Sequence, residues 1–363
     1  MRTTQPSVTV TRADAGTLRD GSPIDRYEIR GERLKAAVLT YGGTLQELWV
    51  PDPDGVAADV VLGLPAASAY EDPHPFFGAL IGRFGNRIAG ATFELNGRTV
   101  HLTANEDTKC LHGGPEGFHA RVWAAQPLPD GVRLSLDSPA GDGGFPAALQ
   151  VTVDYVVDGD ELRIEYRVRN TEPAGGDSTV VNLTNHAYFN LSGEGTGEVG
   201  DHVVQLFGDA YLPVDEAMIP TGEQATVEGT PFDLREPRPF SDGWDSTHEQ
   251  VRRAGGYDHT WVVQAGSETG GQAPVVLAAR VTDPGSGRVM EVLTDQPGVQ
   301  FYTGNSLDGC CTGKSGASYT RRTGFCLETQ HFPDSPHQPA FPSTVLEAGG
   351  SLHSVTVLRF GTR

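Results

Sequence analysis

Long apolar runs are absent from this sequence. No stretch approaches the roughly 18 consecutive apolar residues that suggest a membrane-spanning helix. The first residues, 1–11, mix Thr, Val and Arg and have no apolar core of the kind found in export signals. We therefore expect a cytoplasmic protein that makes no membrane contact.

Positive charge is scarce. Lys and Arg total 27 against 47 Asp and Glu, which gives a formal net charge of -20 at pH 7. Phosphate backbones and anionic lipids repel such a surface, so nucleic acid and membranes are poor partners for it. A neutral small molecule suits this charge better.

Cysteine and histidine motifs are missing as well. The chain has 4 cysteines in no C-x-x-C spacing, and the adjacent residues Cys310 and Cys311 form a pair that rarely bridges. Histidines occur in no H-x-x-x-H spacing, and no glycine-rich phosphate loop joins a strand to a helix. We expect reduced thiols, no metal and no cofactor.

Alternation of period two, by contrast, is abundant. In residues 161–170, Leu162, Ile164, Tyr166 and Val168 alternate with charged side chains, which predicts a strand with one face in water. An Asp-Gly pair links it to a second run at 149–157 and is typical of a tight hairpin turn.

The same pattern recurs along the chain, with further turn dipeptides at 96–97 and 130–131. More strands are expected at 34–40, 45–50, 76–81, 91–95, 98–103, 132–136, 203–206, 275–281, 290–294, 299–302, 324–329 and 354–360. No run of comparable strength has helical period. With 46 Gly and 25 Pro, the chain is predicted to be all-β, as a sandwich or barrel.

Domain organisation is predicted to be simple. Residues 265–273 are Gly-rich enough for a linker, but the segment is short and a surface hairpin loop explains it equally well. The sequence shows no internal repeat of about 20 to 50 residues. We expect one domain over residues 1–363.

Residues 182–191, N-L-T-N-H-A-Y-F-N-L, carry more polar groups than a sheet needs. On a strand, His186, Tyr188 and Asn190 would share one face, and such a row of imidazole, phenol and amide suits a sugar. Taken alone, His186 fits a hydrogen-bonded interior histidine equally well.

A carboxylate stands in the apolar run G-F-C-L-E-T-Q at 324–330. Partial burial of Glu328 would raise its pKa toward the range useful for a base. Taken alone, a paired structural glutamate is the commoner case.

Other segments offer groups that could hold a ligand. Arg83 and Arg87 lie among apolar and Gly residues, where a guanidinium can hold hydroxyls, orient a carboxylate or form an ordinary ion pair. His112 precedes two glycines, and Asp258 is either a hydroxyl acceptor or a turn aspartate.

Together these motifs resemble the aldose 1-epimerase, or galactose mutarotase, family. The resemblance runs from about Tyr41 to about Phe341 and rests on six motifs in the family's order. They are N-L-T-N-H-A-Y-F-N-L, G-R-F-G-N-R-I, L-H-G-G-P-E-G-F, G-Y-D-H, Q-P-G-V-Q-F-Y-T-G-N and F-C-L-E-T-Q. It implies a large antiparallel β-sandwich with an open sugar cleft on one sheet.

The resemblance also implies roles for individual residues. The family's general acid falls on His186 and its general base on Glu328. Its sugar-holding residues fall on Asn86, Arg87, His112, Tyr188, Asp258 and Gln300. Two small departures, Thr260 in place of the frequent Asn and Gly85 in place of Ala, lie beside these groups.

The implied activity interconverts the α and β anomers of free aldoses such as glucose and galactose. Ring opening needs Glu328 ionised and His186 protonated near neutrality, a state that nearby opposite charge would supply, with a bell-shaped pH profile. Three alternatives stay open: a hexose phosphate epimerase, a glycoside hydrolase using Asp258 and Glu328, and a non-catalytic sugar-binding protein. A monosaccharide is the expected partner, and we expect a monomer or weak dimer.

Overall fold

A computed structural model describes residues 8–263 and 273–363. Strands dominate it, and within these ranges the α-helix is limited to α1 (Glu249–Ala254), which ends at Gly255 with a positive φ of 68°. No helix in the described part is long and apolar enough to cross a membrane. The expected surface loop at 265–273 lies, except for its last residue, outside the described residues.

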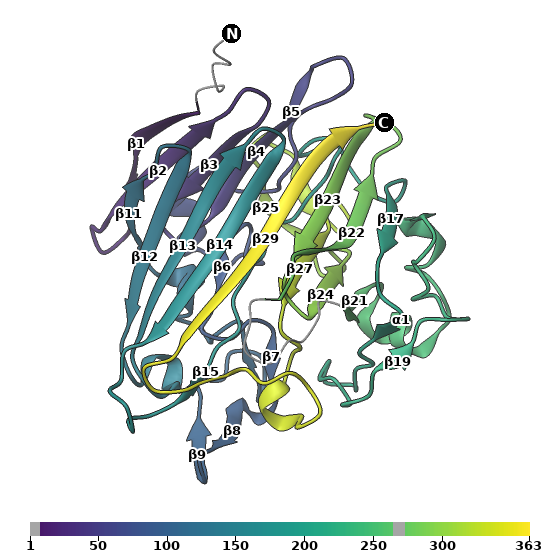
Figure 1. The fold of residues 1–363 in the computed structure, drawn as a ribbon. Coiled ribbons are helices and arrows are strands. Elements are labelled where there is room, and N and C mark those ends of the chain that lie inside the picture. Colours follow the sequence, from purple (N-terminus) through teal and green to yellow (C-terminus); the bar gives the residue numbers. More distant parts are fainter. Residues whose placement is uncertain (1–7, 264–272) are drawn as a thin grey trace.

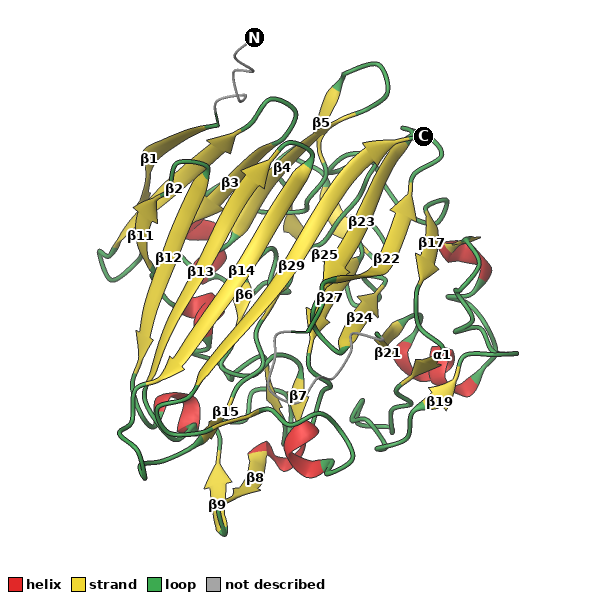
Figure 2. Cartoon of the chain, in the orientation of Figure 1, coloured by secondary structure: helices red, strands yellow, loops and turns green. Residues whose placement is uncertain are grey.

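The largest element is a nine-stranded antiparallel sheet that faces the viewer in Figures 1 and 2. Its strands in spatial order are β11 (Ala124–Pro127), β12 (Gly131–Ser138), β13 (Leu149–Asp158), β14 (Glu161–Asn170), β29 (Ser351–Thr362), β23 (Arg288–Thr294), β22 (Val276–Thr282), β17 (Val203–Leu206) and β20 (Arg238–Pro239).

The register of β13 and β14 shows why the sheet forms as the pattern predicts. Leu149 pairs with Asn170 and Asp158 with Glu161, so the Asp-Gly dipeptide sits at the turn. The apolar side chains of β14 are buried, whereas Arg167 on the other face bonds Asp154 at 2.8 Å. Each fully buried Leu, Ile or Val contributes roughly 1.5–3 kcal/mol.

Two five-stranded antiparallel sheets make up much of the second layer. One has the order β1 (Thr9–Thr17), β2 (Pro23–Arg30), β3 (Lys35–Leu39), β4 (Leu45–Pro51) and β5 (Ala57–Asp59). The other has the order β19 (Ala225–Thr226), β18 (Ala210–Tyr211), β21 (Asp258–Val262), β24 (Gly298–Tyr302) and β27 (Cys326–Gln330).

Short two-stranded pairs complete the set. They are β6 (Leu80–Ile81) with β16 (Thr184–Asn185), β7 (Arg87–Ile88) with β10 (Cys110–Leu111), β8 (Thr92–Leu95) with β9 (Arg98–His101), β15 (Thr179–Val180) with β28 (Val345–Leu346), and β25 (Asp308–Thr312) with β26 (Ser318–Thr320).

Contacts between layers close the sandwich. The Thr329 hydroxyl on β27 lies 2.5 Å from the Thr356 hydroxyl on β29, and the Tyr155 hydroxyl on β13 donates to the Gly43 carbonyl at the β3–β4 turn. One hydrophobic cluster includes buried residues of both layers. The all-β sandwich expected from the alternation is therefore confirmed.

The local structure differs from expectation near the N-terminus and at residues 76–81. Residues 76–81 are not one strand, because Phe76 and Gly78 have positive φ angles of 60° and 66° and only Leu80–Ile81 pairs as β6. Strands β1 and β2 were not expected, and β1 is largely exposed, so its residues carry no strong apolar alternation.

Candidate active site

Three strands of the second layer present one polar face. Thr260 on β21 lies opposite Gln300 on β24, which lies opposite Glu328 on β27. Directly paired antiparallel residues share a face, as do residues two apart, so Asp258 and Cys326 belong to the same surface. The neighbouring residue Thr329 points the other way, into the sandwich. Strand alternation therefore explains why Glu328 faces the site.

A hydrogen-bond chain orders this face. The Thr260 hydroxyl donates to Oε1 of Gln300 at 2.5 Å, and Nε2 of Gln300 donates to Oδ1 of Asp258 at 2.7 Å. In addition, Nδ1 of His259 accepts a hydrogen bond from the backbone N–H of Asp258 at 3.2 Å. Gln300 thus holds the carboxylate of Asp258, and His259 holds its backbone.

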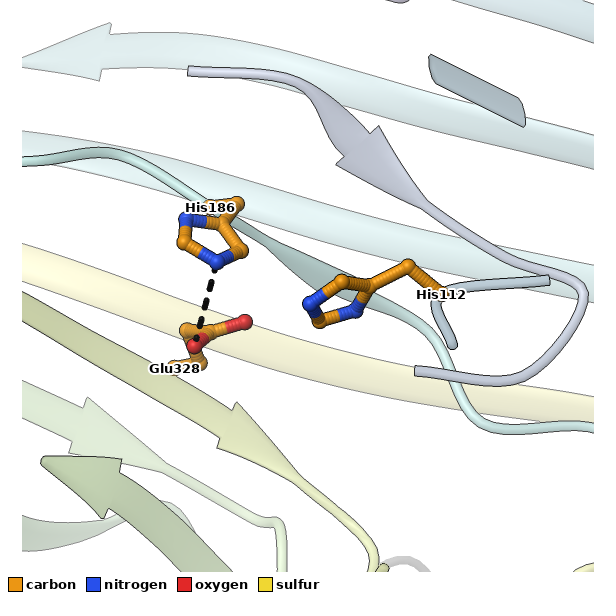
Figure 3. A group of neighbouring side chains, drawn as sticks. All are labelled: His112, His186 and Glu328. Carbon is orange, nitrogen blue, oxygen red and sulfur yellow. Dashed lines mark ion pairs between the residues drawn. The ribbon is translucent and has the colours of Figure 1, made fainter. Parts of the chain in front are cut away.

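His186 approaches Glu328 from the segment after β16. Its Nε2 lies 3.7 Å from Oε1 of Glu328, and both side chains are buried (Figure 3). Backbone bonds to Gly78 and Ala79 hold the segment in place. Oε2 of Glu328 has no hydrogen-bond partner within the described chain.

The segment around His186 is not the regular strand that was expected. The strand β16 ends at Asn185, and Tyr188 is buried against the His186 ring with 5.0 Å between ring centroids. The Asn190 amide donates to the carbonyls of Gly197 and Thr323 and so supports the backbone. Asn190 is therefore not part of a ligand-facing row.

The other ring nitrogen of His186, Nδ1, lies next to a cysteine thiol. Sγ of Cys326 lies 3.6 Å from Nδ1 of His186, and Cys326 is fully buried. The sequence placed Cys326 two residues before Glu328, on the same strand face. That spacing is a signal from which the contact could have been expected.

His112 flanks the pair (Figure 3). The ring atom Nδ1 of His112 accepts the backbone N–H of Asn86 at 3.1 Å. The backbone N–H of His112 donates to the Asn86 carbonyl at 3.0 Å. A neutral His112 consequently carries its proton on Nε2. Donor atoms of His112, His186 and Glu328 lie within 4.8 Å of one another, so these two histidines are not scattered in space as they are in sequence.

Arg87 is both an ion-pair partner and a neighbour of the site. Its Nε and Nη2 donate to the two carboxylate oxygens of Glu106 at 2.7 and 2.8 Å. Arg83 has a structural role instead, because its buried guanidinium donates to Ser138 and to carbonyls of the 138–147 segment. No sequence signal linked Glu106 to Arg87.

An aromatic ring covers one side of the histidines. The Phe76 centroid lies 4.8 Å from that of His112 and 5.8 Å from that of His186. Its positive φ places it there, which the expected strand over 76–81 did not foresee. Phe76 therefore helps to exclude water from the two imidazoles.

Burial sets the protonation of the central pair. It raises the pKa of Glu328 well above its ordinary value; repulsion from Asp258 adds to this and Arg87 opposes it. Burial also lowers the pKa of His186 to about 3. The raised pKa of Glu328 agrees with expectation, but a His186 protonated near neutrality does not. For both groups desolvation is the largest cause, so burial disfavours the charged form of each.

Four of the expected sugar-holding residues line one small cavity of about 10 Å³: Asn86, Arg87, Asp258 and Gln300. His186 and Glu328 are only 5% and 2% exposed. The structure thus gathers the expected site residues, while the open sugar cleft stays a prediction.

Comparisons with known proteins identify the family of the chain. A family model described as aldose 1-epimerase matches residues 25–359. The chain is 44% identical to galactose mutarotase of Bos taurus over 97% of this chain and 99% of that protein. It is 35% identical to aldose 1-epimerase of Escherichia coli, with 94% and 96% of the two chains covered.

Solved structures show the same fold. A C. elegans aldose epimerase homologue superposes with a TM-score of 0.81 at 26% identity, covering 98% of this chain and 99% of that one. A Lactobacillus acidophilus galactose 1-epimerase gives a TM-score of 0.82 at 23% identity, covering 98% and 99%. From the family match over residues 25–359 and the identity to relatives along nearly their whole length, the chain belongs to the aldose 1-epimerase family of isomerases.

Proposed function

We propose that this protein interconverts the α and β anomers of free aldoses such as glucose and galactose, with Glu328 as general base and His186 as general acid. The supporting observation is the 3.7 Å contact between Nε2 of His186 and Oε1 of Glu328 in a buried setting. A proton donor and a proton acceptor are then close enough to act on the same sugar. The relatives named galactose mutarotase and aldose 1-epimerase support the same reaction.

The chemistry needs two coordinated proton transfers. Glu328 removes the proton from the C1 hydroxyl while His186 protonates the ring oxygen, which opens the ring to an aldehyde. Rotation about the C1–C2 bond and reversal of both transfers close the ring on the other face. Each positioned transfer contributes typically 10²–10⁴-fold, as an order of magnitude.

The pKa shifts of the two residues favour one end of this cycle. Ring opening starts with the proton on His186 and ends with a protonated Glu328 and a neutral His186. Burial favours that second distribution. The proton arrangement that accompanies the open-chain aldehyde is therefore the one that burial favours, and ring closure returns a proton to His186.

Neighbouring groups fit the handling of a neutral sugar. Asp258 and Gln300 offer fixed acceptor and donor atoms for hydroxyls, and the Nε2–H of His112 can donate to an oxygen on which negative charge develops. Asn86 and Tyr188 complete the proposed binding set. Because Arg87 is already paired with Glu106, it is poorly placed to neutralise a phosphate, which favours free aldoses over hexose phosphates.

We also propose that residues 1–363 act as one cytoplasmic catalytic unit on a monosaccharide, as a monomer or weak dimer. Polarimetry of freshly dissolved α-D-glucose and α-D-galactose tests the activity. The protein should make the optical rotation relax faster than buffer alone does, and by a larger factor for the two free sugars than for glucose 6-phosphate. Relaxation at the buffer rate for both free sugars would show that the proposal is wrong.

A further inference from the structure

Two adjacent cysteines on β25 bring their sulfur atoms together. Sγ of Cys310 lies 3.3 Å from Sγ of Cys311. Consecutive side chains of a regular strand point to opposite faces, which would separate the two thiols. The close approach therefore needs a local cause.

That cause is a bulge in the β25–β26 hairpin. Asp308 pairs with Thr320 and Thr312 with Ser318, and the register shifts between these pairs. Gly309 has a positive φ of 83°, and the Cys310 N–H donates to Oδ1 of Asp308 at 2.9 Å. Bulges redirect side chains in this way, so the thiol pair is built into the hairpin.

The pair is accessible and borders a cavity. Cys310 is exposed and Cys311 partly exposed, whereas the other two cysteines of the chain are buried. Both sulfur-bearing residues line a cavity of about 250 Å³, together with His74, Phe77 and Tyr319. An apolar or aromatic group attached to the sulfurs would thus lie beside Pro73, His74 and Pro75, which also line this cavity and are not buried.

We propose that Cys310 and Cys311 form a dithiol site that chelates trivalent organoarsenicals, with the organic group in the adjoining cavity. Each thiol gives up its proton as one S–As bond forms. The oxygen of the arsenoxide leaves as water with both protons, and arsenic stays trivalent. Two sulfurs bonded to one atom lie slightly closer together than ordinary contact distance. The sulfurs of Cys310 and Cys311 already lie this close, at 3.3 Å.

The protonation of Cys310 favours this ligand over a metal ion. Hydrogen bonding to Asp308 and Cys311 raises the pKa of Cys310 to about 12. Zinc and similar ions bind the thiolate, which is then rare at neutral pH. The oxygen of an arsenoxide accepts the thiol protons and leaves as water, so this ligand can react with a neutral Cys310.

Intact-mass spectrometry of the folded protein treated with phenylarsine oxide tests the site. One phenylarsenic adduct per chain should form, survive an excess of the monothiol glutathione and disappear with 2,3-dimercaptopropanol. Cys310→Ser and Cys311→Ser should each lose the glutathione-resistant adduct, while Cys110→Ser keeps it. Thermal melts should show that the variants at exposed positions remain folded.

The contrary outcomes are equally clear. No resistant adduct on the wild-type protein, or an adduct that forms only after denaturation, overturns the proposal. Persistence of the resistant adduct in Cys310→Ser also overturns it, because chelation requires both sulfurs. None of these results depends on the sugar activity.

Discussion

Sγ of Cys326 lies 3.6 Å from Nδ1 of His186, at the ring nitrogen that does not face Glu328. A thiol can donate or accept a weak hydrogen bond, so it can serve either tautomer of the imidazole. Being neutral, it does not stabilise the imidazolium as a carboxylate would. Cys326 thus orients His186 while leaving it a strong acid once protonated.

Removing this thiol should slow turnover more than it weakens binding. We expect Cys326→Ala to lower kcat about fivefold, since a net hydrogen bond contributes about 1 kcal/mol, with a smaller change in KM. Cys326→Ser should recover most of the loss. Steady-state polarimetry measures both constants, and Cys110→Ala is a control for loss of another buried thiol. Equal kcat in Cys326→Ala and wild type would remove the orienting role.

The protonation state of His186 can be observed directly. Because burial lowers its pKa to about 3, its ring should stay neutral from pH 7 down to about pH 4. His337 should protonate earlier, since Asp334 raises its pKa. NMR of the histidine ring protons, assigned with His186→Asn, records both titrations. Protonation of His186 at a pH above the ordinary histidine pKa of about 6.5 would contradict this electrostatic account.

Acid should destabilise the fold through buried histidines. His202 accepts the Leu191 N–H on Nε2, and burial lowers its pKa to about 4. Below the unfolded pKa of about 6.5, the unfolded chain binds a proton that the folded chain excludes, so stability falls as the pH decreases to about 4.

For His202 alone, the free energy of unfolding should fall by up to about 1.4 kcal/mol per pH unit in that window. Urea unfolding at pH 7, 6 and 5 measures this slope. His202→Asn should be less stable at pH 7 but have a shallower slope. An unchanged slope would mean that His202 titrates alike in both states.

Arg87 should contribute mainly to sugar binding. We expect Arg87→Ala to raise KM about tenfold with less effect on kcat, because it removes a donor beside Asp258 and leaves Glu106 with Lys109 as its ion-pair partner. Glu106→Gln keeps the guanidinium and should have a smaller effect. Initial-rate polarimetry on both variants separates the two. An unchanged KM in Arg87→Ala would return Arg87 to a purely structural ion pair.

The sequence predicts local features well where one pattern decides them. The bounds of β14 follow from strict alternation, and Glu328 faces the site because it alternates with Thr329. The sequence does not predict the contact of His186 with Glu328, because chain segments far apart create it. The motif resemblance implied that the two residues act in the same reaction, but it did not give the distance between them.

The protonation of the site histidines and the packing of Phe76 over them could not be predicted from the sequence, for related reasons. The low pKa of His186 results from complete burial, including cover by Phe76, whose positive φ breaks the strand pattern. The tautomer of His112 depends on the Asn86 backbone, and the state of Arg87 on Glu106. Each is a long-range contact that no local signal encodes.

The central claim is that Glu328 and His186 transfer the two protons of anomer interconversion. The most direct test is kcat for α-D-galactose, by polarimetry, in Glu328→Gln and His186→Asn beside two matched surface controls, Glu291→Gln and His353→Asn. Both site variants should lose at least about 100-fold in kcat, while the controls stay close to wild type. Near-wild-type turnover in either site variant would contradict the account.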